Sequence, residues 1–362
     1  MIKVLEINTV AFHVNGMSNV IMGLYENIRD KDIRFDFVVK DHIDESYADV
    51  IRKNGDKIFV VERKIKTFPK YINRLAKIIR KGNYDIIHIH GNSSTMSLEL
   101  MAAKKSGTKA KLIVHAHNIA CDHPIVNKIL YPYLMRTADY KIACSRAAGE
   151  WLYGKRRYMV LNNGIDEEKF RFNPEMRKEH RKELGIDDKF VILHVGRYNP
   201  QKNHVFLINV FEEISKREPN AVLRLLGDGF LIEDIKALVK EKNLEDKIFF
   251  VPPTKTPEIE YNAADLFILP SLFEGFGLVN VEAQCSGLPC VVSDPVPHDI
   301  AVTDAIDFIP LDAPLSVWAD AVLKYKGFER RDNRSNVIKS GYSAACGARK
   351  LKNFMKKAAT KK

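Results

Sequence analysis

The sequence predicts an α/β protein made of two doubly wound domains. Its 362 residues exceed what one ordinary core accommodates, since a typical domain has roughly 100 to 200 residues. Short apolar runs alternate with longer helical patterns, as in βα units around a parallel sheet. The alternation begins again at FVILHVG, after a long polar stretch. We therefore expect two Rossmann-like domains that face each other across a deep cleft, bordered by the carboxyl ends of both sheets.

The first half contains seven apolar runs that predict strands, separated by helical patterns such as residues 19–28 and 71–80. The runs are IKVLEIN, RFDFVVK, KIFVVE, DIIHIH, KLIVHAH, YKIACS and RYMVLNN. They predict a first domain over residues 1–168. A turn-rich NNGID at 162–166 and a polar, charged stretch up to 188 follow, which predicts a linker and hinge over residues 169–188.

The second half repeats the architecture without repeating the sequence. Its strand candidates are FVILHVG, AVLRLLGDG, KIFFVPP, LFILPS and PCVVSD, with helical patterns at 204–217 and 231–242. They predict a second domain over residues 189–315. Residues 316–362 are expected to be helical, and KLKNFMKK supplies an apolar stripe with basic flanks that would pack back on the first domain.

Composition points to a globular protein of the cytoplasm. Hydrophobic residues make up 46% and charged residues 28% of the chain, and no run reaches the roughly 18 apolar residues of a membrane-spanning helix. MIKVLEINTV opens directly on a strand pattern, so no signal peptide is expected. Five cysteines without a CxxC pair suit buried thiols in a reducing compartment better than disulfides or a zinc site.

The net charge of +11 is concentrated at the end of the chain. Residues 324–362 hold 13 Lys and Arg and two acids, 13 − 2 = +11, so the first 323 residues are balanced. A nucleic-acid-binding fold would carry its basic stripe throughout, and we expect no nucleic-acid partner. The basic segment is either a solvated helix face or a surface attracted to an anionic membrane or a pyrophosphate-bearing acceptor, at about 1 kcal/mol per basic residue.

The strongest motif is FEGFGLVNVEA at residues 273–283, which follows the LFILPS strand and opens a helix. Gly275 and Gly277 let a ligand approach the backbone closely, and the first turn of the helix offers free N–H groups to a phosphate. Glu274 and Glu282 place a carboxylate near each end of this motif, and a carboxylate can accept hydrogen bonds from both hydroxyls of a ribose.

These residues resemble the retaining family 4 glycosyltransferases, whose Glu-x7-Glu motif is written here as EGFGLVNVE. The resemblance covers most of residues 1–315, through GRYNPQK, LLGDG, the NAADLFILPS run, SGLPCVVSD and NGID. It implies a GT-B fold and transfer of a hexose-type sugar from a nucleotide sugar, UDP-sugar by default, with retention of anomeric configuration. It also implies no metal and no other cofactor.

The resemblance implies roles for the donor-side residues. Arg197 and Lys202 would bind the diphosphate and offset the charge on the leaving group, and Glu274 would hold the donor sugar. Glu282 would bind the ribose. The backbone near sugar and phosphate would come from Phe276, Gly277, Leu278 and Val279.

In the first domain the resemblance implies a phosphate contact at Gly16 and a donor-sugar contact at His117. Family members often have two adjacent glycines at the first turn, whereas this chain has Asn15-Gly16. His115 alternates with His117 on the same side of its strand and is the other candidate for the sugar contact. His88 and His90 alternate likewise and are interpreted as core or cleft-wall histidines.

The mixture of VHAHN, NPQKNH and EGFGLVNVEAQCSGLPCVVSD is similar to transferases of capsule and exopolysaccharide assembly. It implies a saccharide or lipid-linked saccharide acceptor and work at the inner face of the cell membrane. Two alternatives remain. One is a nucleotide-sugar 2-epimerase of similar fold, against which the Glu-x7-Glu segment argues, and the other is a non-catalytic nucleotide- or saccharide-binding protein.

Overall fold

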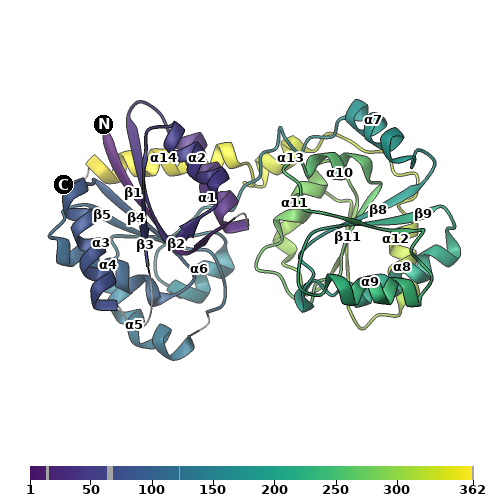
Figure 1. Ribbon diagram of the computed structural model, residues 1–362, viewed down its shortest axis with the longest axis horizontal. Coiled ribbons are helices and arrows are strands. Elements are labelled where there is room, and N and C mark those ends of the chain that lie inside the picture. Colours follow the sequence, from purple (N-terminus) through teal and green to yellow (C-terminus); the bar gives the residue numbers. More distant parts are fainter. Residues whose placement is uncertain (14–15, 63–67, 122, 361–362) are drawn as a thin grey trace. The chain divides into compact units, whose positions relative to one another are not determined.

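The computed structural model describes residues 1–13, 16–62, 68–121 and 123–360. The chain forms two compact units, which are described separately (Figure 1). Unit 1 comprises Met1–Gly164 together with Ala344–Lys362, and unit 2 comprises Ile165–Ser343. Both units are α/β structures around a parallel sheet, as the alternating pattern predicts.

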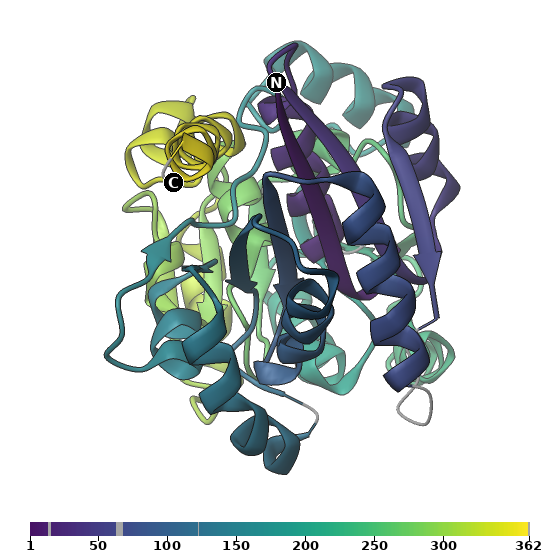
Figure 2. The same cartoon turned by 90° about the vertical axis from the view of Figure 1, so that its left-hand side faces the viewer.

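Unit 1 holds a seven-stranded parallel sheet in the order β3-β2-β1-β4-β5-β6-β7, and Figure 2 shows these strands side by side. The strands are β1 (Ile2–Phe12), β2 (Ile33–Ile43), β3 (Lys57–Val61), β4 (Ile86–Gly91), β5 (Lys111–Ala116), β6 (Tyr140–Ala143) and β7 (Met159–Val160). The helices are α1 (Gly16–Ile28), α2 (Glu45–Lys53), α3 (Phe68–Gly82), α4 (Ser97–Ser106), α5 (Pro124–Thr137), α6 (Arg146–Tyr153) and α14 (Ala344–Thr360). The order reverses between β1 and β4, which makes the carboxyl ends of these two strands the topological switch point.

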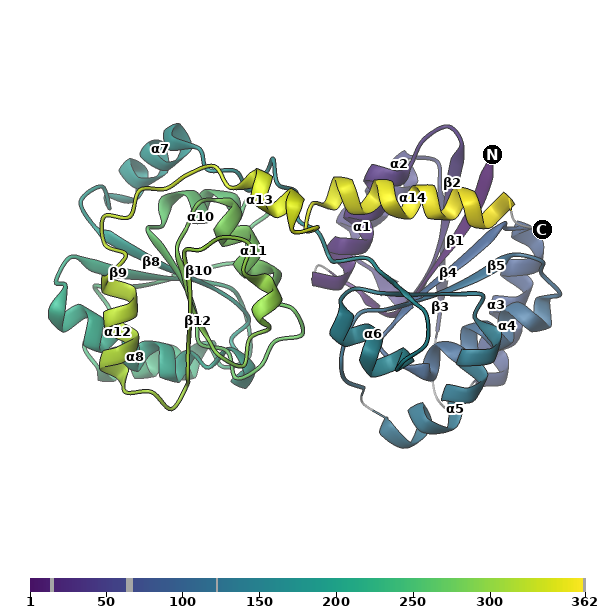
Figure 3. The ribbon, with the colours of Figure 1, turned by 180° about the vertical axis from the view of Figure 1, so that it is seen from behind.

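The two faces of the unit 1 sheet differ in polarity. Leu5, Ile89 and Val114 lie in an apolar core with α3, α4 and α6. The side chains of Glu6, His88 and His90 lie on the opposite face of the sheet, beside α1 and the last helix α14. Figure 3 shows α14 running beside α1, so the end of the chain covers the polar face of the sheet.

Unit 2 holds a six-stranded parallel sheet in the order β10-β9-β8-β11-β12-β13. The strands are β8 (Phe190–Val195), β9 (Ala221–Leu226), β10 (Ile248–Val251), β11 (Leu266–Leu269), β12 (Cys290–Ser293) and β13 (Ile306–Ile309). The helices are α7 (Pro174–Leu184), α8 (His204–Arg217), α9 (Ile232–Glu241), α10 (Glu258–Ala263), α11 (Leu278–Cys285), α12 (Leu315–Leu323) and α13 (Arg334–Lys339). Side chains of α8, α9 and α12 form the core on one face, and those of α10, α11 and α13 form the core on the other.

Local sequence explains a helix inside the range expected to be a linker. Asn173 accepts hydrogen bonds from the first N–H groups of α7, Pro174 occupies its first turn, and Gly185 ends it with φ 63°. Helix α7 packs against α10 within unit 2. Asp265 holds it to the sheet, because its carboxylate accepts from Arg177 Nη2 at 2.5 Å, Arg181 Nη1 at 3.1 Å and the backbone N of Val191 at 2.7 Å.

The basic C-terminal segment is shared between the units. Residues up to Ser343 belong to unit 2, and α14 belongs to unit 1. On α14, Lys352 Nζ lies 2.5 Å from Asp30 Oδ2 and Lys356 Nζ lies 3.4 Å from Asp32 Oδ2. Part of the basic charge therefore fastens the last helix to the turn before β2. No helix in the described part of the chain is both long and apolar enough to cross a membrane.

Candidate active site

The centre of the unit 2 site is an ion pair between Lys202 and Glu274. Lys202 ends the short helix Pro200–Lys202 that follows β8, and Glu274 lies in the loop that follows β11. The Lys202 Nζ lies 2.7 Å from Glu274 Oε1, and the two side chains are only 13% and 7% exposed. Since β8 and β11 are neighbours in a parallel sheet, both loops leave the same edge.

Two further side chains hold the Glu274 carboxylate. Ser271 Oγ donates to Oε1 at 2.7 Å, and Gln201 Nε2 donates to Oε2 at 3.3 Å. Oε1 thus has two strong donors and Oε2 has one long one. The second oxygen retains the capacity to accept a hydrogen bond from a ligand.

The backbone next to Glu274 takes the form that the two glycines predict. Gly277 is the N-cap of α11 with φ 83°, a left-handed conformation that side-chain-bearing residues rarely adopt. Leu278 and Val279 begin the helix, and their N–H groups belong to its unpaired first turn. Phe276 is 9% exposed and packs in the core, so only its backbone is available to a ligand.

Glu282 lies one turn further along α11. Its Oε2 accepts a hydrogen bond from the hydroxyl of Tyr261 at 2.7 Å, and burial raises the pKa of the Glu282 carboxyl. The carboxyl therefore keeps Oε1 for another partner. The sequence analysis did not single out Tyr261, which lies on α10.

Arg197 differs from the other charged residues of this site in exposure. Its side chain is 77% exposed, and its Nε lies 3.9 Å from Asp228 Oδ1, a weak contact at a solvated surface. The loop that carries it is nevertheless closely packed. A Cβ on Gly227 would lie 2.0 Å from the carbonyl oxygen of Gly196, and one on Gly196 would lie 3.0 Å from Lys202 Cδ. These glycines let the loops after β8 and β9 touch.

In unit 1, Gly16 is the first residue of α1, after the carboxyl end of β1. A Cβ built there would meet no described atom within 4 Å. Crowding therefore does not require a glycine at this position. Asn15, the residue expected to replace the first of two glycines, lies outside the described residues.

His117 follows β5 and belongs to a buried group of polar side chains on β1, β4 and β5. His90 Nδ1 lies 2.9 Å from His117 Nε2, and His90 Nε2 lies 2.7 Å from Glu6 Oε2. His88 contacts the same carboxylate at 3.0 Å, and His115 stacks between the others without a hydrogen-bond partner among the described residues. His88 and His90 are core histidines, as interpreted from the sequence, but they are hydrogen-bonded to a buried acid that the sequence analysis missed.

Comparisons with known proteins agree on the type of protein. A family model described as Glycosyltransferase Family 4 matches residues 14–169, and one described as Glycosyl transferases group 1 matches residues 176–306. The chain belongs to the GT-B glycosyltransferases. Between them the two matches take in every residue to which the sequence analysis assigned a role at the site.

Relatives of this glycosyltransferase include two bacterial proteins that are themselves named as glycosyltransferases. It is 28% identical to "Putative glycosyltransferase EpsF" of Bacillus subtilis over 324 residues, which cover 85% of this chain and 84% of that protein. It is 32% identical to the UDP-Gal:alpha-D-GlcNAc-diphosphoundecaprenol alpha-1,3-galactosyltransferase of Escherichia coli over 243 residues, 62% of each chain. Among solved structures, Anabaena HepE in complex with UDP matches with a TM-score of 0.80 at 17% identity, covering 98% of this chain and 100% of that one. The last comparison shows the fold.

Unit 1 of the glycosyltransferase has a cavity of about 470 Å³ beyond the carboxyl ends of β1, β4 and β5. Its wall combines apolar side chains with hydroxyl and amide groups and one lysine. The lining residues include Thr9, Val10, Lys40, Phe68, Asn92, Ser93, Thr95, Leu98, Asn118, Val126 and Leu130.

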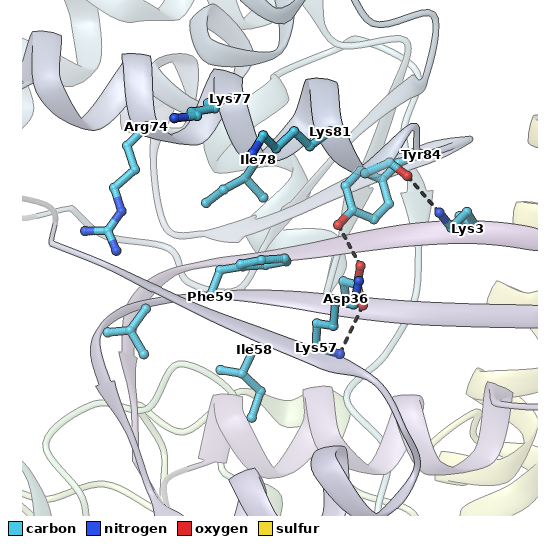
Figure 4. Close-up of a pocket in the computed structure, with 12 residues that line it drawn as sticks. Lys3, Asp36, Lys57, Ile58, Phe59, Arg74, Lys77, Ile78, Lys81 and Tyr84 are labelled. Atoms are coloured by element: carbon cyan, nitrogen blue, oxygen red, sulfur yellow. Dashed lines mark hydrogen bonds between the residues drawn. The ribbon is translucent and has the colours of Figure 1, made fainter.

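A larger cavity of about 720 Å³ lies at the amino edge of the same sheet. Figure 4 shows Arg74, Lys77 and Lys81 of α3 along one wall and Phe59 on the other. Ligands of open α/β sheets bind beyond the carboxyl ends of the strands. We therefore assign no part of the transfer reaction to this cavity, despite its size.

Proposed function

We propose that the protein transfers a hexose-type sugar from a nucleotide sugar, by default a UDP-sugar, to a saccharide or lipid-linked saccharide with retention of configuration and without a metal. The observation that carries the proposal is the buried Lys202–Glu274 pair beside the left-handed Gly277 at the start of α11. This arrangement offers a cation, a carboxylate and free backbone N–H groups within one loop cluster, which matches the groups of a sugar diphosphate.

The cations act on the leaving group. When the bond between the anomeric carbon and the diphosphate breaks, negative charge grows on the phosphate oxygen. A lysine ammonium has three donors, so Lys202 can keep its bond to Glu274 and still donate to that oxygen. The exposed guanidinium of Arg197 adds a planar fork for the second phosphate. Two cations at the diphosphate can replace the charge compensation that a metal would supply.

The carboxylates bind hydroxyls. Glu274 keeps acceptor capacity on Oε2 for a sugar hydroxyl, and Glu282 keeps Oε1 for the ribose because Tyr261 occupies its other oxygen. In a single displacement at the anomeric carbon, retention requires that the acceptor oxygen attack from the side that the diphosphate leaves. In this route the departing phosphate oxygen takes the proton of the acceptor hydroxyl as the new glycosidic bond forms.

The cavity at the carboxyl edge of unit 1 supports an acceptor with polar and apolar parts. Asn92, Ser93 and Asn118 can bind sugar hydroxyls, and Lys40 suits a phosphate. Helix α5 beside the cavity exposes 76% of Ile125 and 70% of Ile129, which are apolar surfaces suited to a lipid chain. The Escherichia coli relative is named for a diphosphoundecaprenol acceptor, an anionic lipid-linked saccharide of this kind.

A donor panel tests the proposal. Purified protein is incubated with UDP-, GDP- and ADP-sugars, with and without lipid-linked acceptors, and nucleoside diphosphate release is measured in the presence of EDTA. We expect acceptor-dependent release with one nucleotide, no effect of EDTA, and an α-linked product from an α-linked donor by NMR. Release of free sugar epimer without acceptor would favour the epimerase, and binding without turnover would favour a non-catalytic protein.

The basic C-terminal segment is proposed as a contact with the inner membrane face. Lys352 and Lys356 are engaged with aspartates of unit 1, which leaves exposed residues such as Arg349 and Lys357 for a surface. Sedimentation with vesicles at low salt should show binding to anionic and not to neutral lipid. Equal binding to both would overturn the electrostatic contact.

A further inference from the structure

Unit 1 contains a continuous chain of hydrogen bonds from a buried acid to His117. Glu6 lies on β1, His90 lies on β4 and His117 follows β5, so three neighbouring strands contribute one group each. Glu6 Oε2 lies 2.7 Å from His90 Nε2, and His90 Nδ1 lies 2.9 Å from His117 Nε2. Glu6 is 7% and His90 is 2% exposed, so water does not compete for these bonds.

The ionisation of the three groups determines where the protons lie. Burial lowers the pKa of His90 to about 4 and that of His117 well below its usual value, so both rings are neutral at pH 7. Burial acts to raise the pKa of Glu6, but His88 and His90 outweigh it and lower that pKa to about 2. Glu6 is therefore a carboxylate, which only accepts hydrogen bonds.

A carboxylate at one end gives the chain a direction. His90 must carry its proton on Nε2 to donate to Glu6, which leaves its Nδ1 as an acceptor. His117 must then carry its proton on Nε2 to donate to His90. Its Nδ1 is left with a lone pair. That atom is buried, and no described residue offers it a hydrogen bond.

We propose that Glu6 and His90 hold His117 in the Nε2–H tautomer, so that His117 Nδ1 accepts a hydrogen bond from a hydroxyl of the donor sugar. Glu6 and His90 are positioning residues, since they act through His117. The assignment of the sugar contact rests on the proposed function. A hydrogen bond to His117 Nδ1 also confers specificity. The site then selects a sugar that has a hydroxyl at this position over its deoxy or O-methyl analogue.

A metal site is the competing use of these side chains. His88, His90 and His115 each have a nitrogen within 4.8 Å of the others, and buried imidazoles are typical zinc ligands. However, both nitrogens of His90 are already engaged with Glu6 and His117. His88 and His115 alone supply fewer than the three protein ligands that zinc sites use. The hydrogen bonds of His90 and a bound metal ion therefore exclude each other.

Nitrogen NMR of the full chain tests the tautomer without any substrate. Histidine labelled with ¹⁵N is incorporated, the His117 ring is assigned by comparison with His117→Gln, and zinc content is measured on the same sample. We expect a protonated Nε2 and an unprotonated Nδ1. A protonated Nδ1, or stoichiometric bound zinc, would overturn the proposal.

Kinetics of three variants test the positioning role. His90→Phe keeps a ring but removes both hydrogen bonds, and we expect kcat for transfer to fall by about 100-fold with UDP affinity unchanged. His90→Gln can donate to Glu6 and accept from His117 through its amide, and it should recover most of the loss. His88→Phe is the matched control, since it removes a neighbour of the same carboxylate and leaves the chain to His117 intact.

Equal losses in His88→Phe and His90→Phe, or no recovery in His90→Gln, would contradict the positioning role. If His90→Phe does not fold, the Gln variant and the NMR assignment of the natural chain still decide. Failure of the proposed function would give a different result. The His117 tautomer would be as expected, but no donor would be turned over. Transfer at the normal rate by His117→Gln would instead overturn the sugar contact proposed for His117.

Discussion

The carboxyl edges of the two sheets carry opposite kinds of polar chemistry. Unit 2 gathers full charges, with Lys202 against Glu274 in a nearly buried pair and Arg197 extended into solvent. Unit 1 gathers imidazoles around a buried carboxylate, Glu6, and burial lowers the pKa of His90, His115 and His117. Two units of similar architecture therefore present different polar groups at the carboxyl edges of their sheets. Charges suit a diphosphate, and neutral acceptors suit hydroxyls.

The largest effect is expected from breaking the charged pair of unit 2. Lys202→Met leaves the Glu274 carboxylate buried without its cation, which should cost about 3–5 kcal/mol of unfolding free energy. Transfer should fall by about 10²–10³-fold, since a cation at the leaving group is lost. Urea unfolding followed at Trp318, in a Trp151→Phe background, reports on unit 2, because the chain has only these two tryptophans and Trp151 lies in unit 1.

A double variant separates stability from chemistry. Lys202→Met with Glu274→Gln removes both charges and should regain most of the lost stability without regaining transfer. If the double variant recovered activity, the charges would have a structural role only, and the comparison between the two edges would fail.

Acidification should affect unit 1 more than unit 2. The pKa of His90 is lowered to about 4 from an ordinary 6.5, and burial also lowers the pKa values of His115 and His117. Between pH 6.5 and 4 the unfolded state binds more protons than the folded state, so stability falls as the pH falls. For His90 the loss amounts to about 3 kcal/mol at pH 4.

In unit 2 the shifted pKa values have opposite effects on stability as the pH falls. Burial lowers the pKa of His194 and that of His204, to about 4, but it raises the pKa of Glu282. A raised carboxyl pKa means that the folded state takes up a proton first, which offsets part of the histidine loss as the pH falls. Acid titrations of Trp151→Phe and Trp318→Phe should therefore show unit 1 unfolding at the higher pH. The reverse order would show that the histidine group does not control unit 1.

A matched pair of glycine substitutions should show a smaller difference. Gly277→Ala forces a Cβ into φ 83° and within 3.0 Å of Asn280 Nδ2, and we expect a loss of about 1–2 kcal/mol. Gly16→Ala meets no atom within 4 Å and should change stability by less than about 0.5 kcal/mol. Reduced donor affinity in a stable Gly16→Ala would support its proposed phosphate contact, and unchanged affinity would remove Gly16 from the site.

The smallest effect on stability is expected at Arg197. Because its side chain is 77% exposed and only weakly paired, Arg197→Ala should leave the unfolding free energy within about 0.5 kcal/mol. UDP affinity by calorimetry should nevertheless fall, and Asp228→Ala is the control that removes only its neighbour. Unchanged affinity in Arg197→Ala would show that the diphosphate depends on Lys202 without it.

Much of the fold follows from local patterns. The apolar run FVILHV forms β8, and Gly277, which precedes LVNVE, is the N-cap of α11. Element boundaries differ from the expectation where local signals are weaker. RYMVLNN contributes only Met159–Val160 as strand, and α7 lies where a linker was expected. Boundaries depend on caps and on packing partners, which a run of apolar letters does not contain.

Glu274, Glu282 and the backbone of residues 276–279 could be proposed from sequence because they occupy one loop and the helix that follows it. Their partners could not. Tyr261 reaches Glu282 because α10 packs against α11, and the loop after β11 turns Ser271 toward Glu274. Asp265, a member of a recognised motif, anchors α7 to the sheet.

Two α/β units and the loop that carries Glu274 follow from the sequence alone, because periodicity and turn chemistry act over neighbouring residues. The contact of Glu6 with His90, 84 positions away, and the ion pairs of Lys352 and Lys356 with Asp30 and Asp32 follow only from the folded structure. Hydrogen bonds and ion pairs depend on distance in space, which a sequence does not contain. The sheet order, with β1 beside β4 and β4 beside β5, creates those distances.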